Sequence, residues 1–343
     1  MEVNQMTERK KIGLALQGGG SHGAFTWGVL DRILEDDRVD IEGIVGTSAG
    51  AMNAAVTAHG LAHDGNQTAR EALGKFWQAV GDMGAQSFLQ PSWMDRMMGV
   101  GNMDYSPAWF MMDLASRMMS PYQLNPANYH PLRDLLDKQV DFEKIRQLEH
   151  VKVFLCATNV RTNRLRLFEN SEISVDAVLA SACLPFLFKA IEIDGEHYWD
   201  GGYMGNPPIF PLAYNCTSSD VILVMVNPIT IDDVPQSARE ILDRINTLSF
   251  NSSLMREMRA INFVNHLVDR GFDDGGRLKK MRIHCIDAED EMKNLGVSSK
   301  LNARPEFIQW LYQLGRDRGD AFLREHFDKI GKESSTSIEE RFL

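Results

Sequence analysis

The 343-residue chain contains no run of about 18 apolar residues, the length that a membrane-spanning helix requires. Its first eleven residues are polar and lack the apolar segment of a secretory signal peptide. We therefore expect a cytoplasmic protein whose only contact with a membrane or lipid surface is peripheral.

Cysteine is also scarce, with four residues in the chain. Cys156, Cys183, Cys216 and Cys285 are far apart and have apolar neighbours, so they are typical of reduced core residues in an intracellular protein. No Cys-x-x-Cys pair, His-x-x-x-His pair or acidic calcium loop occurs, and the nine histidines are scattered. The sequence predicts neither a metal site nor another cofactor.

Basic residues are outnumbered, with 36 Lys and Arg against 47 Asp and Glu, which gives a formal charge of -11. Nucleic-acid binding and polybasic attachment to anionic membranes both depend on clustered positive charge, so this balance argues against them. Hydrophobic residues make up 44% of the chain and charged residues 24%, which is typical of a globular protein with a large core.

The most informative feature that is present is Gly46-Thr47-Ser48-Ala49-Gly50. An apolar run at 41–45 predicts a strand before it, and the alanine-rich segment 51–56 predicts a helix after it. A serine on a sharp turn between strand and helix presents its hydroxyl above the sheet, and glycines on both sides allow the backbone to approach closely. Ser48 is therefore a candidate nucleophile.

A glycine-rich segment lies upstream, where Gly18-Gly19-Gly20 follows a predicted strand at 12–16 and precedes a predicted helix at 24–34. Bare backbone N–H groups at the start of a helix can bind an anion or a developing oxyanion. The same segment, Gly18–Gly23, also fits Gly-x-Gly-x-x-Gly, the fingerprint of dinucleotide binding. That alternative lacks the carboxylate expected at the tip of the second strand.

A third segment, Asp200-Gly201-Gly202, follows a predicted hairpin at 192–199. An aspartate before two glycines often marks only a turn. A carboxylate at this position would act as a base for Ser48 if the fold brings the two within hydrogen-bonding reach.

The order of these three segments resembles that of the patatin-like phospholipase family. A fourth segment, 180–188, is similar to the helix-to-proline turn that precedes the family's aspartate. The resemblance covers about residues 11–215. It implies an α/β fold of three layers, with a mostly parallel central sheet and helices on both faces, and a substrate that is a lipid acyl ester.

For the site, the resemblance implies a Ser–Asp dyad in which Ser48 is the nucleophile and Asp200 the base. It also implies that the backbone of Gly18, Gly19 and Gly20 forms the oxyanion hole. One departure is visible: the family often has Arg or Lys directly after the three glycines, where this chain has Ser21 and His22.

Three other functions remain as alternatives. An α/β-hydrolase with a Ser-Asp-His triad would place several strands before its nucleophile, whereas only two fit before Gly46. A dinucleotide- or phosphate-binding protein would use Gly18–Gly23. An inactive scaffold that binds other proteins would not need both Ser48 and Asp200.

The remaining pattern predicts one domain with extensions. Residues 11–215 form the catalytic region, residues 216–330 extend it with strands at 221–226 and 281–286 and helices at 241–268 and 305–327, and residues 331–343 form a flexible tail. Between the motifs, residues 93–119 hold eight of the 18 methionines. Such a segment is either helical core or a flexible lid over Ser48 that contacts an acyl chain.

Overall fold

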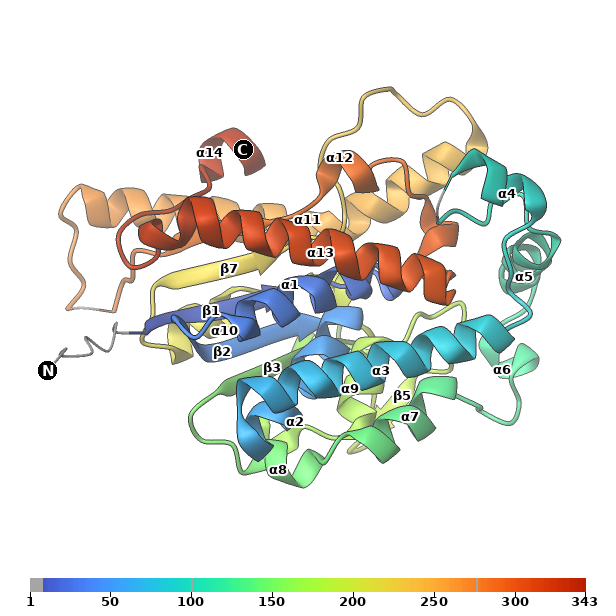
Figure 1. The fold of residues 1–343 in the computed structure, drawn as a ribbon, viewed down its shortest axis with the longest axis horizontal. Coiled ribbons are helices and arrows are strands. Elements are labelled where there is room, and N and C mark those ends of the chain that lie inside the picture. The colour runs from blue at the N-terminus through green and yellow to red at the C-terminus, as the bar shows by residue number, and fades with distance from the viewer. Residues whose placement is uncertain (1–8, 100, 276) are drawn as a thin grey trace, which may run out of the picture.

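Within residues 9–99, 101–275 and 277–343, which this computed structural model describes, eight β-strands form one mixed sheet (Figure 1). The strand order is β5-β6-β3-β2-β1-β7-β8, and β4 pairs with β3 outside this path. The strands are β1 (Lys10–Leu16), β2 (Val39–Thr47), β3 (Lys152–Asn159), β4 (Leu165–Glu169), β5 (Ile191–Ile193), β6 (Glu196–Asp200), β7 (Asp220–Val224) and β8 (Arg282–Ile286).

The centre of the sheet is parallel. β1 pairs in parallel with β2 and β7, β2 with β3, and β7 with β8, while β4, β5 and β6 form the antiparallel part beside β3. Because parallel neighbours need a crossover, helices connect these strands across the faces of the sheet. The predicted mostly parallel sheet is confirmed, and β7 and β8 show that the C-terminal third belongs to it.

Helices cover both faces, so successive residues of one strand enter different cores. Leu14 and Ile44 pack with the first group of helices, whereas Ala15 and Val45 pack with the second. This double burial explains why the central strands are continuously apolar. The first group contains α1 (Gly23–Glu35), α2 (Ala49–Asp64), α3 (Asn66–Gln86), α9 (Val175–Ser181) and α13 (Pro305–His326), and the second contains α10 (Phe210–Asn215) and α11 (Ala238–Asp269).

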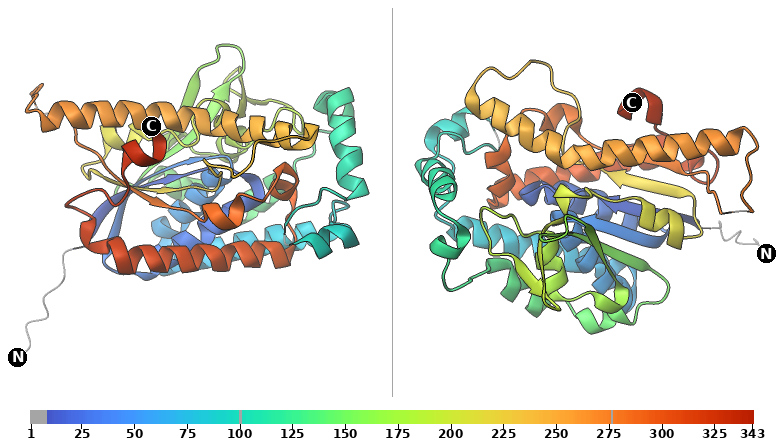
Figure 2. Two further views of the ribbon diagram at one scale, coloured as in Figure 1. Left: turned by 90° about the horizontal axis from the view of Figure 1, so that it is seen from above. Right: turned by 180° about the vertical axis from the view of Figure 1, so that it is seen from behind.

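The two longest C-terminal helices lie on opposite sides of the sheet (Figure 2, left). Phe307 and Phe322 of α13 pack against the core that contains α1, whereas Leu254 and Met258 of α11 pack against the other face. The three-layer α/β arrangement expected from the sequence is therefore confirmed.

The segment expected to be a flexible tail, 331–343, instead ends in a helix, α14 (Ile338–Phe342). Ile338 and Phe342 are both buried and join the core beneath α11. Before that helix, Thr336 N–H donates to Ile283 O of β8. The two apolar residues lie one helical turn apart, so they pack on one face although the surrounding sequence is polar.

The methionine-rich segment is not core. It forms α4 (Trp93–Met98) and α5 (Pro107–Met118), followed by α6 (Pro121–Leu124), and α5 has no buried residue. Met103 is buried, but Met97 and Met118 are each 76% exposed. Of the two alternatives left by the sequence, core packing therefore does not describe most of this segment, although Met103, Asp95 and Ser106 are buried.

Candidate active site

Ser48 lies on the turn between β2 and α2. Its backbone has φ 56° and ψ -122°, in the positive-φ region that side chains disfavour. The Ser48 N–H donates to Ser181 Oγ of α9 at 2.9 Å. A strained serine held at the N-terminal end of a helix is the geometry that the Gly-x-Ser-x-Gly pattern predicts.

The flanking glycines permit this turn because the backbone passes very close to them. A Cβ on Gly46 would lie 2.3 Å from Gly50 O, and a Cβ on Gly50 would lie 2.1 Å from Leu16 O. Neither contact can be relieved by a side-chain rotation, since both involve backbone atoms. The turn therefore requires glycine at both positions.

Strand register brings Asp200 beside Ser48. Thr47 of β2 is paired with Cys156 of β3, and the next residue of β3, Ala157, is paired with Asp200 of β6. Ser48 and Asp200 thus flank the same level of β3, two strand spacings or about 10 Å apart in backbone terms. The Ser48 side chain is close enough to lower the pKa of the Asp200 carboxyl, although it forms no hydrogen bond of normal geometry with Oδ2.

The Asp200 carboxyl is fully buried and only partly satisfied. Oδ1 accepts a hydrogen bond from Gly202 N–H at 2.7 Å, whereas Oδ2 has no partner of strict hydrogen-bond geometry. Burial raises the pKa of Asp200 to about 6, while Ser48, the Gly202 N–H and the charge of Lys300 lower it. A carboxylate whose pKa lies near neutrality suits general base catalysis.

The backbone of Asp200 is fixed by segments that the sequence analysis grouped with it. Its N–H donates to Cys183 O at 2.8 Å, within the 180–188 turn, and its carbonyl accepts from Thr158 Oγ1 at 2.8 Å. Thr47 Oγ1 donates to Gly205 O at 2.7 Å, which ties the following loop to the end of β2. The helix-to-proline turn therefore positions the aspartate.

The glycine-rich segment lies directly against Ser48, since a Cβ on Gly18 would be 2.6 Å from the Ser48 Cβ. Its three N–H groups are not equivalent. Gly18 N–H donates to Asn206 Oδ1 at 2.7 Å, so it is committed to the protein. Among the described residues, no hydrogen bond uses the N–H of Gly19 or Gly20. Of the three predicted oxyanion donors, Gly19 and Gly20 have unused N–H groups.

The orientation of these groups depends on residues that sequence reasoning missed. Gly18 O accepts hydrogen bonds from the side-chain amides of Asn227, at 2.8 Å, and Asn206, at 3.4 Å. In a trans peptide the C=O and the following N–H point in opposite directions. Asn227 and Asn206 therefore direct the Gly19 N–H away from themselves. No local motif marks either asparagine.

Comparison with known proteins identifies the family of the chain. A family model described as "Patatin-like phospholipase" matches residues 14–213, which is more than half of the chain. The chain belongs to the patatin-like phospholipase family. The members of this family are acyl hydrolases, and their substrates are lipids. The family assignment favours hydrolysis over the dinucleotide-binding alternative for the glycine segment.

Solved structures with similar folds are distant in sequence. VipD from Legionella pneumophila is 15% identical with a TM-score of 0.43, and the match covers 96% of this chain and 72% of VipD. The type III effector ExoU is 13% identical with a TM-score of 0.36, covering 93% of this chain and 54% of ExoU. The ExoU–SpcU complex of Pseudomonas aeruginosa gives 15% identity, a TM-score of 0.32 and coverage of 95% and 62%. Comparison with curated protein sequences found no match.

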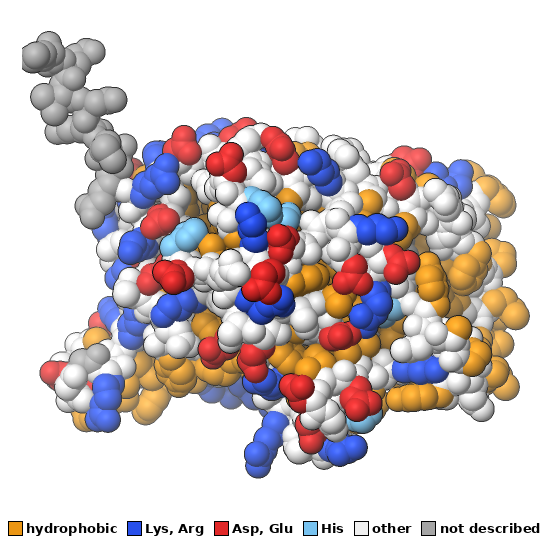
Figure 3. Space-filling model, turned by 90° about the horizontal axis from the view of Figure 1, so that it is seen from below, with side chains coloured by type: hydrophobic (Ala, Val, Ile, Leu, Met, Phe, Trp, Pro, Cys, Tyr) orange, Lys and Arg blue, Asp and Glu red, His pale blue; other side chains and the backbone are white. Residues whose placement is uncertain are grey.

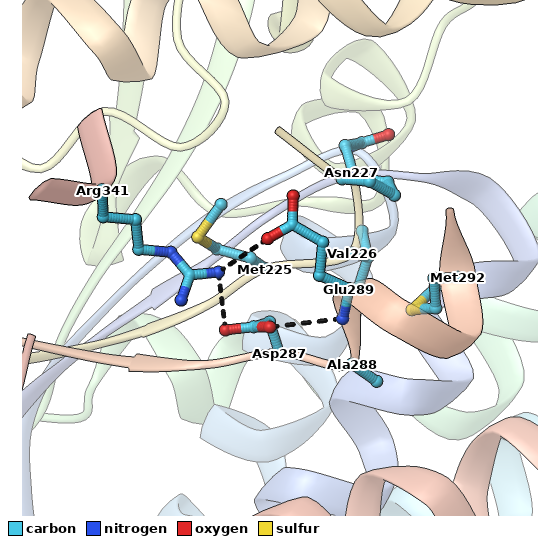
Figure 4. Close-up of a pocket in the computed structure, with 9 residues that line it drawn as sticks. Met225, Val226, Asn227, Asp287, Ala288, Glu289, Met292 and Arg341 are labelled. Carbon is cyan, nitrogen blue, oxygen red and sulfur yellow. Dashed lines mark hydrogen bonds and ion pairs between the residues drawn. The ribbon is translucent and has the colours of Figure 1, made fainter. Parts of the chain in front are cut away.

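A separate hollow lies between the ends of β7 and β8 and contains no candidate catalytic group (Figure 4). There Arg341 of α14 forms ion pairs with Asp287 at 2.8 Å and Glu289 at 3.3 Å. Its cavity volume of about 10 Å³ holds at most one water molecule. The hollow is part of the anchoring of the C-terminal helix.

All four cysteines are free, and three of them, Cys156, Cys183 and Cys216, are buried as expected, whereas Cys285 is only partly buried. Burial raises the pKa of Cys156, next to Asp200, so its thiol stays protonated and is not a nucleophile. Among the described residues, no group of three or more His, Cys, Asp or Glu side chains is arranged to hold a metal ion.

Proposed function

We propose that the protein hydrolyses lipid acyl esters through a Ser48–Asp200 dyad, with the Gly19 and Gly20 N–H groups as the oxyanion hole. The observation that carries the proposal is the buried Asp200 carboxyl, which has one unpartnered oxygen and a neighbouring strained serine. Gly18, the remaining glycine of the three that the resemblance implies, contributes differently: its missing side chain leaves room for Ser48.

The chemistry needs only these groups. The carboxylate of Asp200 accepts the proton of Ser48 Oγ as Oγ attacks the ester carbonyl. The carbonyl oxygen becomes an oxyanion beside the free glycine N–H groups, each of which contributes about 3 kcal/mol to the transition state. Asp200 then gives the proton to the departing alcohol. In the second half, Asp200 takes a proton from water as the water oxygen attacks the acyl carbon. The bond from that carbon to Ser48 Oγ then breaks, Asp200 returns the proton to Oγ, and the fatty acid departs.

Solvent has little access to these two side chains. Ser48 is 7% exposed and Asp200 is fully buried. Phe250 of α11 packs against Gly202, two residues after the aspartate, because a Cβ on Gly202 would lie 2.3 Å from its ring. Binding of a lipid therefore requires movement of side chains above the serine, a step that excludes water from the reacting atoms.

A lipid surface provides both the substrate and a partner for the exposed apolar end. Helices α4, α5 and α6 lie together at the end toward which the parallel strands run, the end that carries Ser48 (Figure 1). Hydrophobic side chains gather at that end of the surface (Figure 3). The exposed members include Trp93, Met97, Met98, Phe110, Met111, Met118 and Tyr122.

Charge supports the same contact. From Pro107 to Leu124 the chain has one acidic and one basic residue, Asp113 and Arg117, which pair with each other at 2.9 Å. The negative charge of this -11 protein therefore lies elsewhere and does not oppose a lipid surface. No helix among the described residues is long and apolar enough to span a bilayer, so the proposed contact is peripheral.

The test is hydrolysis of a panel of phospholipids, lysolipids and neutral lipids by the purified protein, read by mass spectrometry. We expect Ser48-dependent release of fatty acid and labelling of Ser48 by a fluorophosphonate probe. The matched control is Ser299→Ala, because Ser299 is a buried serine near the glycine segment that the mechanism does not use. Release of fatty acid by Ser48→Ala at the wild-type rate would refute the proposal.

The lipid contact is tested separately by sedimentation with neutral phosphatidylcholine vesicles. Replacing Met97, Phe110 and Met118 by Gln is expected to weaken binding about tenfold or more, since each removes apolar surface from contact with the bilayer. The variant should retain turnover of a water-soluble ester. Unchanged sedimentation would show that another surface binds lipid.

A further inference from the structure

Lys300 is a partly buried cation beside the glycine segment, and it lies outside the part of the chain that the family model matches. It belongs to the 3-10 helix η4 (Val297–Leu301), which packs on the 3-10 helix η1 (Gly20–His22). A Cβ on Gly20 would lie 2.2 Å from Lys300 O, and Gly20 itself has φ +60°. The backbones of the two segments are therefore in direct contact.

The Lys300 ammonium is held by two amide oxygens. Its Nζ donates to Asn227 Oδ1 at 2.8 Å and to Asn246 Oδ1 at 3.2 Å, and it lies 5.5 Å from the centre of the Phe250 ring. Asn227 passes the connection on, because its Nδ2 donates to Gly18 O. A hydrogen-bonded chain therefore runs from the Lys300 charge to the peptide that joins Gly18 and Gly19.

We propose that Lys300 is a positioning residue of the hydrolase site, which orients the Gly19 N–H through Asn227 and supplies the positive charge that faces the oxyanion segment and Asp200. Fixing Asn227 keeps its amide nitrogen on Gly18 O, and the planar peptide then aims the Gly19 N–H at the opposite side. The inference rests on the proposed function and adds a residue to it.

The surrounding charges agree with this role. Burial lowers the pKa of Lys300 to about 8, while Asp243 and Asp200 raise it, so the ammonium form still dominates at neutral pH. His22, which follows the glycines, offers no charge, because burial and the charge of Lys300 lower its pKa to about 3. Farther out, Asp104 raises the pKa of Asp243 and Arg239 lowers it, so their effects on that carboxyl oppose each other.

The test compares Lys300→Met with Lys300→Arg in ester hydrolysis across pH. For Lys300→Met we expect kcat to fall about tenfold to a hundredfold, less than the loss for removing a direct oxyanion donor, with KM nearly unchanged. The acid limb of kcat/KM should move to higher pH, because the Lys300 charge lowers the pKa of Asp200 and its removal lets that pKa rise. Lys300→Arg keeps the positive charge, so its kcat and the pH of its acid limb should lie close to those of the wild type.

Lys293→Met is the matched control, because Lys293 pairs with Asp232 and Asp290 on the surface of the same C-terminal segment. It should leave rate and pH profile unchanged. Asn227→Ala should lower kcat similarly, and the double variant with Lys300→Met should fall little further, since both act on one peptide. The proposal would be overturned if the acid limb of Lys300→Met did not move and if the kcat losses of Lys300→Met and Asn227→Ala were additive in the double variant. If Lys300→Met does not fold, Lys300→Gln and Asn227→Ala serve in its place.

A direct readout separates this inference from the proposed function. Carbon-13 NMR of labelled aspartate, assigned with Asp200→Asn, reports the pKa of Asp200 without turnover. A rise in Lys300→Met supports the coupling even if no ester is hydrolysed. If the wild type is active but the Asp200 pKa is unchanged in Lys300→Met, the role proposed for Lys300 is refuted and the proposed function stands. If the pKa rises in Lys300→Met but the wild type shows no Ser48-dependent hydrolysis, the proposed function is refuted and the coupling stands.

Discussion

Two buried aspartates differ in their surroundings: Asp220 is held by structural contacts, whereas Asp200 is the base that we propose. Asp220, at the start of β7, receives hydrogen bonds from Arg282, His284 and the Gly331 N–H. Asp200 receives one full hydrogen bond, from Gly202 N–H. Burial disfavours the charge of both, but only Asp220 has partners that reverse the effect and hold its pKa well below the ordinary value.

The difference teaches that structural contacts alone can account for an arrangement that resembles a catalytic triad. His284 lies between Asp220 and Ser335: its Nε2 is 3.0 Å from Asp220 Oδ1, and its Nδ1 is 3.0 Å from Ser335 Oγ. The ring is buried, and neighbouring serine and threonine residues of this segment bond to the backbone of β8. These contacts attach the C-terminal segment to the sheet, whereas Asp200 keeps an oxygen free for a proton.

The largest expected effect is that of Asp200→Asn. Loss of the base should reduce hydrolysis by about 10³-fold or more, because Ser48 then has no proton acceptor. The same change should raise the free energy of unfolding at pH 8 by about 1–3 kcal/mol, since it removes a buried charge whose pKa is about 6. Urea unfolding and ester hydrolysis measure the two effects, and a stability loss with retained activity would reverse the roles assigned here.

Asp220→Asn should give the opposite pair of results. We expect a loss of about 3–5 kcal/mol in the free energy of unfolding, because Arg282 is left as a partly buried charge without its carboxylate. Activity per folded molecule should remain near that of the wild type. Urea denaturation combined with active-site titration by fluorophosphonate measures both, and a greatly reduced turnover of folded protein would contradict the structural role.

The two carboxyls should also separate in pH. In the proposed mechanism Asp200 acts only when ionised, so kcat/KM should fall about tenfold per unit below pH 6. Asp220 has a lowered pKa in the folded state, so its contribution to stability is present above about pH 4 and is lost as pH falls through the folded value. Activity should therefore decline reversibly at a pH where the protein remains folded, as circular dichroism can verify.

The smallest expected effect is that of Ser335→Ala. Removing its hydroxyl takes one hydrogen bond from His284 and should cost about 0.5–1.5 kcal/mol of unfolding free energy. Hydrolysis should not change, and fluorophosphonate should not label Ser335 in the wild type. Labelling at that position would make the second constellation a catalytic one.

The sequence predicted much of this arrangement because the relevant signals are local. Apolar runs identified β1, β2, β3 and β7, and glycine spacing identified the turn at Ser48, where backbone contacts allow no other residue. The pairing of Ser48 with Asp200 needed the family resemblance, since register across β3 is not visible in one strand.

Other features depend on distant contacts and leave no local signal. Lys300 stands in an ordinary polar stretch, and only the packing of η4 on the glycine segment gives it a neighbour in Asn227. The methionines of 93–119 have the composition of either a core or a surface helix, and tertiary position decided between them. The prediction of a flexible tail at 331–343 was wrong because the two apolar residues of its helix are too few to predict burial.

The backbone of Ser48 limits what kind of nucleophile this turn can carry. With φ 56° and close backbone contacts at the neighbouring glycines, the position already accommodates a side chain at a conformational cost. A threonine would add a branch at Cβ, which such a conformation disfavours further, whereas a cysteine keeps the unbranched shape. The scaffold is thus open to conversion into a thiol enzyme and closed to a secondary alcohol.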